Sequence, residues 1–69
     1  MKDKWTQIAG QWKQFAGEAR KKWGQLTDEE LAKVNGDRKA LVGLIQERYG
    51  IAKKAADKQV DTWANSLKV

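Results

Sequence analysis

The chain has 69 residues, a formal net charge of +5, and neither Cys nor His. A domain of this length buries only about 60% of the surface that its unfolded chain exposes, which leaves little room for an internal active-site cavity. The missing residue types exclude disulfides, Cys/His zinc sites, Ser-His-Asp triads and Cys nucleophiles. We therefore expect one small domain, residues 1–69, that is not an enzyme and holds no cofactor or metal.

The sequence also predicts where in the cell the protein is located. No apolar run approaches the ~20 residues of a membrane span, and the start, MKDKWTQIAG, lacks the apolar segment of a signal peptide. We expect a cytoplasmic protein without a transmembrane segment, and a monomer.

The N-terminal third has helical periodicity. At about 100° per residue, its large apolar side chains fall within one arc of about 120°, the width of a stripe that faces a core. Gly10 and Gly17 lie on the polar side, where each costs about 1 kcal/mol relative to Ala. Two starts therefore stay open: a helix that is regular from Asp3, or one that begins near Gly10 after a frayed extension, residues 1–9. Gly24 suits the position after the helix end. The arc contains Trp5, Ile8, Trp12, Phe15, Ala19 and Trp23.

Basic side chains accompany this stripe. Lys13, Arg20 and Lys22 flank it and Lys21 lies opposite, and we call these four residues the basic edge. Aromatic residues interleaved with basic ones are also what a single-stranded nucleic-acid binder presents to its ligand. The helical geometry favours a buried stripe with basic edges over a stacking platform. The basic edge is the candidate contact for an anion or a nucleic acid.

A second, short helix is marked by its start. Thr27-Asp28-Glu29-Glu30 has the pattern of a capping box, with Leu26 and Leu31 at the two staple positions. The three acids could suggest a metal site, but their place in the first turn of a helix explains them through capping and the helix dipole.

A third helix is expected between Asp37, a possible N-cap, and Gly50. Asn35-Gly36 ends the helix before it. The apolar residues of the third helix cover more than half of its circumference, so we expect it to be the most buried. The hydroxyl of Tyr49 is expected at the rim. The apolar positions are Leu41, Val42, Leu44, Ile45 and Tyr49.

The fourth helix has a weak start. Ala52 falls at the N-cap position without a side-chain acceptor, and Lys53 and Lys54 oppose the dipole. Its apolar side carries Ala56, Val60, Trp63, Ala64 and Leu67.

These elements predict an all-α fold of four short helices. The short links imply two helical hairpins packed across one another, with Trp residues at the crossing. The predicted core consists of Trp12, Phe15, Trp23, Leu31, Leu41, Leu44, Ile45, Tyr49, Val60 and Trp63.

The order of motifs resembles a known family. WKQFAG, WGQLTDEEL and LVGLIQERYG follow one another as in the CsbD-like family of small bacterial general stress-response proteins, over about residues 10–63. The resemblance implies a small all-α fold of helical hairpins and a bacterial cytoplasmic protein that accumulates under stress. It supplies no catalytic or ligand-binding residue. Glu18-Ala19 stands where relatives often add positive charge, which weakens the case for a nucleic-acid face shared by the family.

Three functions follow in order of preference. The first is a non-enzymatic stress-response protein whose partner is unknown. The second is a weak, salt-dependent nucleic-acid-binding module, in which the basic edge meets phosphates. The third is an amphipathic binder of a membrane surface or of a protein partner, which would use the first helix.

Overall fold

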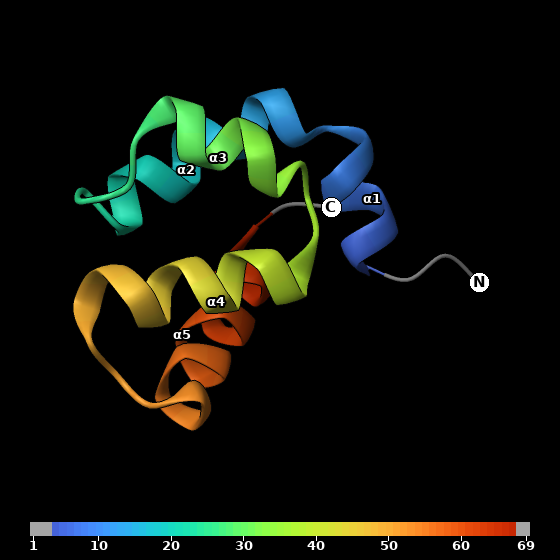
Figure 1. The fold of residues 1–69 in the computed structure, drawn as a ribbon. Coiled ribbons are helices and arrows are strands. Elements are labelled where there is room, and N and C mark those ends of the chain that lie inside the picture. The colour runs from blue at the N-terminus through green and yellow to red at the C-terminus, as the bar shows by residue number, and fades with distance from the viewer. Residues whose placement is uncertain (1–3, 68–69) are drawn as a thin grey trace.

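The computed structural model describes residues 4–67, which form five α-helices and no strand (Figure 1). The all-α class is confirmed, and the expected number of four helices is wrong. The helices are α1 (Lys4–Gly10), α2 (Trp12–Lys22), α3 (Asp28–Val34), α4 (Arg38–Tyr49) and α5 (Lys53–Ser66).

The additional helix arises from a break in the N-terminal third. Gly10 ends α1, and Gln11 leaves helical geometry with φ −121° and ψ 31°. The Gln11 amide donates to the carbonyl of Ile8 at 3.1 Å, a tighter turn than an α-helix makes. Gly10 makes this interruption inexpensive because glycine stabilises a helix interior poorly. Residues 4–9 are therefore helical, and Asp3 lies outside the described residues.

Contacts on both sides hold α1 in place. Ile8 is fully buried, and the ring of Trp5 lies 6.3 Å from that of Trp63. Ala9 sits against the link between α3 and α4, where Gly36 has φ +80°. A Cβ built on Gly36 would lie 2.5 Å from the Cα of Ala9. Only glycine satisfies both the positive φ and this close approach.

The predicted helix ends are largely confirmed. The Thr27 hydroxyl accepts from the amide of Glu30 at 3.1 Å, and the Glu30 carboxylate accepts from the amide of Thr27 at 3.0 Å. Asn35 adopts the left-handed conformation, and the Asp37 carboxylate caps α4 by accepting from the amide of Lys39. Ala52 precedes α5 without a side-chain cap.

Gly24 differs from Gly50 although both follow a helix. Among the described glycines, Gly36 and Gly50 have positive φ, so Gly24 does not adopt the left-handed conformation. Helix α2 ends at Lys22, and the next residue, Trp23, caps it without a left-handed residue: its amide donates to the carbonyl of Ala19 at 2.8 Å.

Consecutive helices pack against one another. Helix α2 contacts α3, α3 contacts α4, and α4 contacts α5. In Figure 1, α2 and α3 form the upper layer and α4 and α5 the lower one, with α1 at one end. The contacts of α2 with α3 and of α4 with α5 are those expected of the two predicted hairpins, which we call the first and the second hairpin. That they form two hairpins packed across one another stays a prediction.

One hydrophobic cluster joins all five helices, so the described residues form a single small domain. Trp63 of α5 lies at its centre, with ring centroids 6.4 Å from Trp12 and 5.4 Å from Trp23. Both of these buried indoles find a hydrogen-bond acceptor. Trp12 Nε1 donates to the carbonyl of Leu31 at 2.7 Å, and Trp23 Nε1 donates to Gln59 Oε1 at 3.0 Å.

Two predicted core residues are only partly buried. Leu44 and Tyr49 pack against the edge of the cluster, and the Tyr49 hydroxyl accepts from the amide of Gln25 at the rim. Helix α4 nevertheless has the smallest share of exposed residues of the five helices, four of twelve, as the sequence predicts. The other predicted core residues are buried: Trp12, Phe15, Trp23, Leu31, Leu41, Ile45, Val60 and Trp63.

The contacts of Trp12 predict two different losses of stability. Trp12→Ala removes a buried indole and should lower the free energy of unfolding by about 3–5 kcal/mol, enough to unfold most of so small a domain. Trp12→Phe keeps an aromatic ring but loses the hydrogen bond to the Leu31 carbonyl. The loss of this bond should lower the free energy of unfolding by about 1 kcal/mol, in addition to any effect of altered packing. Urea unfolding followed by circular dichroism measures both. A Trp12→Ala variant as stable as the wild type would contradict this account of the core.

Candidate functional site

The basic edge lies along α2 and is exposed. Arg20, Lys21 and Lys22 occupy the last turn of the helix, where positive charge faces the negative end of the dipole. Lys13 lies near the opposite end of the same helix and is also exposed. Arg20, Lys21 and Lys22 therefore stabilise α2 through the helix dipole, independently of any ligand.

Two of the four charges are also paired within the molecule. Arg20 Nη1 lies 3.1 Å from Asp28 Oδ1, which joins the end of α2 to the first turn of α3. Lys21 Nζ lies 3.7 Å from Glu18 Oε1. Within residues 4–67, Lys13 and Lys22 have no acidic partner. The basic edge is thus two free lysines with two partly neutralised neighbours, rather than one convergent cluster.

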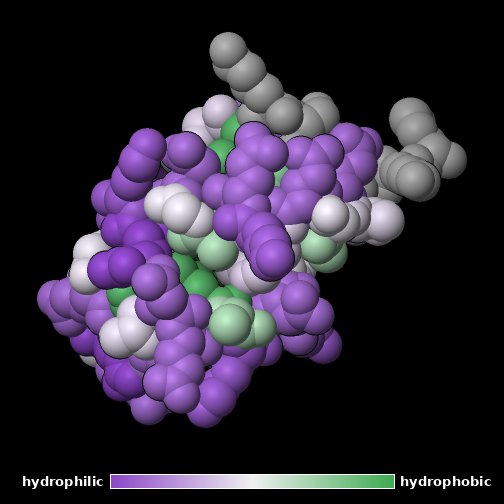
Figure 2. All heavy atoms as spheres, turned by 90° about the horizontal axis from the view of Figure 1, so that it is seen from above, coloured by the Kyte–Doolittle hydropathy of each residue, from purple (hydrophilic) through white to green (hydrophobic). Residues whose placement is uncertain are grey.

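The aromatic side chains are not part of this surface. Trp12, Phe15 and Trp23 are 6%, 3% and 2% exposed. Seen from the side of α2 and α3, the surface is mainly hydrophilic, and apolar atoms show only in gaps between polar side chains (Figure 2). Base stacking on these three rings would require α2 to leave the core.

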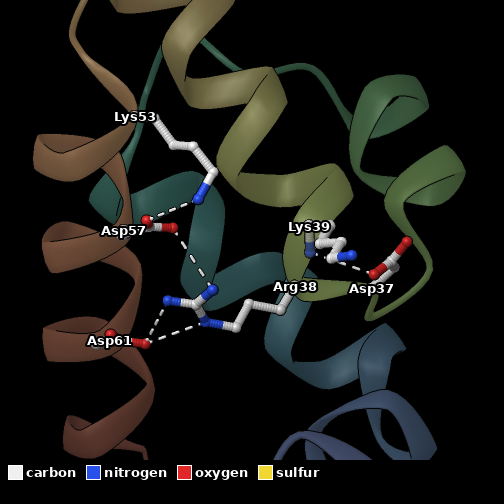
Figure 3. A network of polar contacts seen from close by, with 6 residues as sticks. All are labelled: Asp37, Arg38, Lys39, Lys53, Asp57 and Asp61. Carbon is white, nitrogen blue, oxygen red and sulfur yellow. Dashed lines mark hydrogen bonds and ion pairs between the residues drawn. The ribbon is translucent and has the colours of Figure 1, made fainter.

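A second group of charged residues, which was not among the candidates predicted from the sequence, joins α4 to α5. Arg38 Nη1 lies 3.4 Å from Asp57 Oδ1, and its Nη2 lies 2.9 Å from Asp61 Oδ1. Lys53 Nζ lies 3.1 Å from Asp57 Oδ2. Figure 3 shows the Arg38 side chain reaching from α4 to Asp57 and Asp61 of α5, and Lys53 contacting Asp57 along α5. The spacing of Lys53, Asp57 and Asp61, four residues apart on one helix face, was the available signal.

This group borders a cleft of about 360 Å³, which Val42, Gly43 and Gln46 also line. Arg38 is about one third exposed, and both of its acidic partners hold it. Asp57 Oδ1 is buried and makes no hydrogen bond to any described residue, so its contact with Arg38 is its main compensation. We call the ion pairs of Arg38 and Lys53 with Asp57 and Asp61 the latch, because those of Arg38 connect α4 to α5. The two cations are already paired with carboxylates of the same chain.

The first hairpin contains a connection at the positions that correspond to those of the latch, because the sequence has an internal repeat. Gly10, Gly17 and Gly24 recur as Gly36, Gly43 and Gly50, each 26 positions later. The same shift takes the start of α2 at Trp12 to the start of α4 at Arg38, and Leu31 to Asp57.

The repeated positions make the same connection with different chemistry. In the first hairpin, the Trp12 indole donates to the backbone of Leu31 inside the core. In the second hairpin, the Arg38 guanidinium pairs with the Asp57 carboxylate at the surface. Each pair ties the first helix of its hairpin to the second.

The remaining acids of the first turn of α3 also have roles in the fold. Glu30 completes the capping box and forms an ion pair with Arg48 of α4. Asp28 holds Arg20. In the described part of the chain, no three Asp or Glu side chains are grouped so that they could hold a metal ion. No helix among residues 4–67 is both long and apolar enough to cross a membrane.

Known proteins share this sequence over most of its length. A sequence model of the family described as CsbD-like matches residues 6–58. UPF0337 protein ECA0631 of Pectobacterium atrosepticum is 52% identical over 62 residues, which cover 90% of each chain. UPF0337 protein YjbJ of Escherichia coli is 49% identical over 57 residues, or 83% of each chain. UPF0337 protein RPA4217 of Rhodopseudomonas palustris is 48% identical over 64 residues, covering 93% of this chain and 97% of that protein.

The latch predicts a pair of mutations that compensate each other. Arg38→Leu leaves Asp57 Oδ1 buried without its cation and should lower the free energy of unfolding by about 1–3 kcal/mol. Adding Asp57→Leu, the residue type of the first hairpin, should recover much of that loss. Denaturant unfolding of Arg38→Leu, Asp57→Leu and the double variant measures this, with Lys58→Leu as the exposed control. A double variant that loses the sum of the two single effects would show that the pair is not coupled.

Proposed function

Because the chain belongs to the CsbD-like family, we propose that it is a non-enzymatic bacterial stress-response protein that acts in the cytoplasm. The resemblance described above supports the role in stress. The use of the polar side chains supports the absence of catalysis. Glu30 and Asp37 cap helices, and the carboxylates of Asp28, Asp57 and Asp61 pair with arginines.

One observation supports this proposal most directly: the largest side chains are committed to the core. Trp12, Trp23 and Trp63 are almost fully buried in one cluster. Ligand sites in proteins combine apolar side chains with a few convergent polar groups. In this domain the apolar side chains hold five short helices together. A role that depends on a folded, exposed polar surface fits this distribution better than a role that depends on a cavity.

The role in stress is tested in the bacterium that encodes the chain. We expect a deletion strain to survive osmotic, heat or starvation stress less well than its parent, and the wild-type gene to restore survival. A gene carrying Trp12→Ala, which should not fold, should fail to restore it. Survival of the deletion strain equal to the parent under all three stresses would contradict the proposal. Protein abundance, measured by immunoblotting, should rise under the stress that reveals the phenotype.

A second candidate function rests on the free charges of the basic edge. Lys13 and Lys22 are exposed, and within residues 4–67 no acid neutralises them. Phosphates of a nucleic acid would meet these lysines without disturbing the core. Such binding depends on counterion release and is therefore weak and steeply dependent on salt. The aromatic residues would not contribute to it, which predicts little preference for base sequence.

The membrane-surface alternative has less support. It needs the apolar face of α1 or α2, and Ile8 and Trp12 of that face are buried in the core. Binding would require part of the domain to unfold, which would raise the exposure of its tryptophans to lipid. Anionic vesicles test this alternative through a blue shift of tryptophan fluorescence.

For nucleic acid, we expect fluorescence anisotropy of labelled single-stranded and duplex DNA to show binding at low salt that is largely lost at physiological salt. Lys13→Glu with Lys22→Glu should make the slope of log K against log salt shallower by about 1.5. Lys33→Glu with Lys58→Glu changes the net charge equally on other helices and is the matched control. Equal loss of binding in both double variants would contradict a specific role of the basic edge.

A further inference from the structure

Helix α4 has an exposed face that the fold does not use. Lys39, Gly43 and Glu47 lie on successive turns and are all exposed. Figure 1 shows α4 along the front of the molecule, between α3 and α5. A Cβ built on Gly43 would have no atom within 4 Å. Glycine in a helix interior costs about 1 kcal/mol relative to Ala, and no described residue needs the space that it leaves.

A groove runs beside this face between α3 and α4. Its volume is about 470 Å³, and Val34, Ala40 and Leu44 contribute apolar surface to it, with Lys33 and Glu47 at its rim. Ala40 and Leu44 are only partly buried. The face therefore combines partly exposed apolar side chains with a gap in the helix surface that would let another backbone come close.

The charges on this face are complementary to those on the same face of a second, antiparallel copy of α4. Lys39 lies four residues before Gly43 and Glu47 four residues after it, so at about 100° per residue they fall about 40° to either side. A twofold axis that lies in the interface at Gly43, perpendicular to the slanted row of Lys39, Gly43 and Glu47, makes the two α4 helices antiparallel and crossed and places Lys39 over Glu47 of a second copy. It also places Glu47 over Lys39 of that copy. The two ion pairs form together, as in any interface made of one surface meeting itself.

These charges are available for such a contact. Lys39 has no acidic partner within residues 4–67. Glu47 lies 3.9 Å from Arg48, its neighbour in the chain, and its side chain is 74% exposed. We propose that α4 is a self-association surface, on which two copies of the chain pair antiparallel across Gly43. This proposal differs from the monomer expected from the sequence.

The first hairpin explains why α4 rather than α2 has this role. Gly17 is the counterpart of Gly43, and it is likewise exposed with no atom near a built Cβ. Its flanking positions are Lys13 and Lys21, both basic. A twofold axis through Gly17 would bring lysine against lysine twice, which is repulsive. Glycine is thus present on both helices, but charge complementarity is present on α4 alone.

Sedimentation equilibrium across a range of concentrations up to millimolar tests the proposal. The wild type should associate reversibly from one-chain to two-chain mass. Lys39→Glu and Glu47→Lys should each weaken association by at least about tenfold, because each creates two like-charge contacts. An equimolar mixture of the two single variants should recover association, since every facing pair is then opposite in charge. The variant that carries both substitutions should associate like the wild type.

Two further variants separate association from folding. Gly43→Leu places a side chain at the crossing point, and its Cβ would have no atom of its own chain within 4 Å. The variant should therefore stay helical by circular dichroism and lose association. Gly17→Leu makes the same change on α2 and should leave association intact. A wild type that keeps one-chain mass at every concentration would overturn the proposal. So would single charge variants that associate normally, or a mixture that does not recover.

Discussion

The packing of three indole rings around the ring of Trp63 is the contact on which the other elements depend. Trp63 comes from the last helix, and its ring meets Trp5 of α1, Trp12 of α2 and Trp23 at the end of α2. Tryptophan buries about 150–250 Å² of surface, so a few such rings can supply the apolar area that so short a chain otherwise lacks. Their contacts join residues from both ends of the sequence. In a domain without a disulfide or a zinc site, this cluster takes the place of a cross-link.

The cluster also decides where function can lie. A buried indole needs a hydrogen-bond acceptor, and Trp12 and Trp23 find theirs in Leu31 and Gln59. Those bonds fix the orientation of the rings and compensate the indole N–H groups for their burial in the core. Interactions with other molecules must then use the polar surface, where α2 and α4 present exposed charges. The interleaving of aromatic and basic residues in the sequence is therefore a property of one amphipathic helix with two unrelated faces.

Local signals in the sequence predicted local structure well. The capping box at Thr27 and Glu30, the left-handed Asn35 and the cap at Asp37 each involve residues within a few positions of one another. Contacts between distant residues could not be predicted in the same way. The latch between Arg38 and Asp57 requires knowledge of which face of α4 meets α5. The partial exposure of Leu44 has the same origin, because the apolar residues of α4 cover more than half of its circumference. Periodicity then leaves open which side lies next to the partner helix.

The two hairpins show how a repeated structure can acquire two surfaces. Gly17 and Gly43 occupy the same position in their helices, but Lys21 of the first has Glu47 as its counterpart in the second. This one difference turns a face that repels its own copy into one that attracts it. Helix α2 lies in the other layer of the molecule, behind α3 (Figure 1), so pairing through α4 would leave the basic edge of each copy uncovered. A dimer would then carry two basic edges, which a polyanion long enough to reach both could contact together. Two weak contacts held in one particle raise the effective affinity without any new contact. Self-association and weak binding of anions would therefore reinforce each other as the protein becomes more abundant.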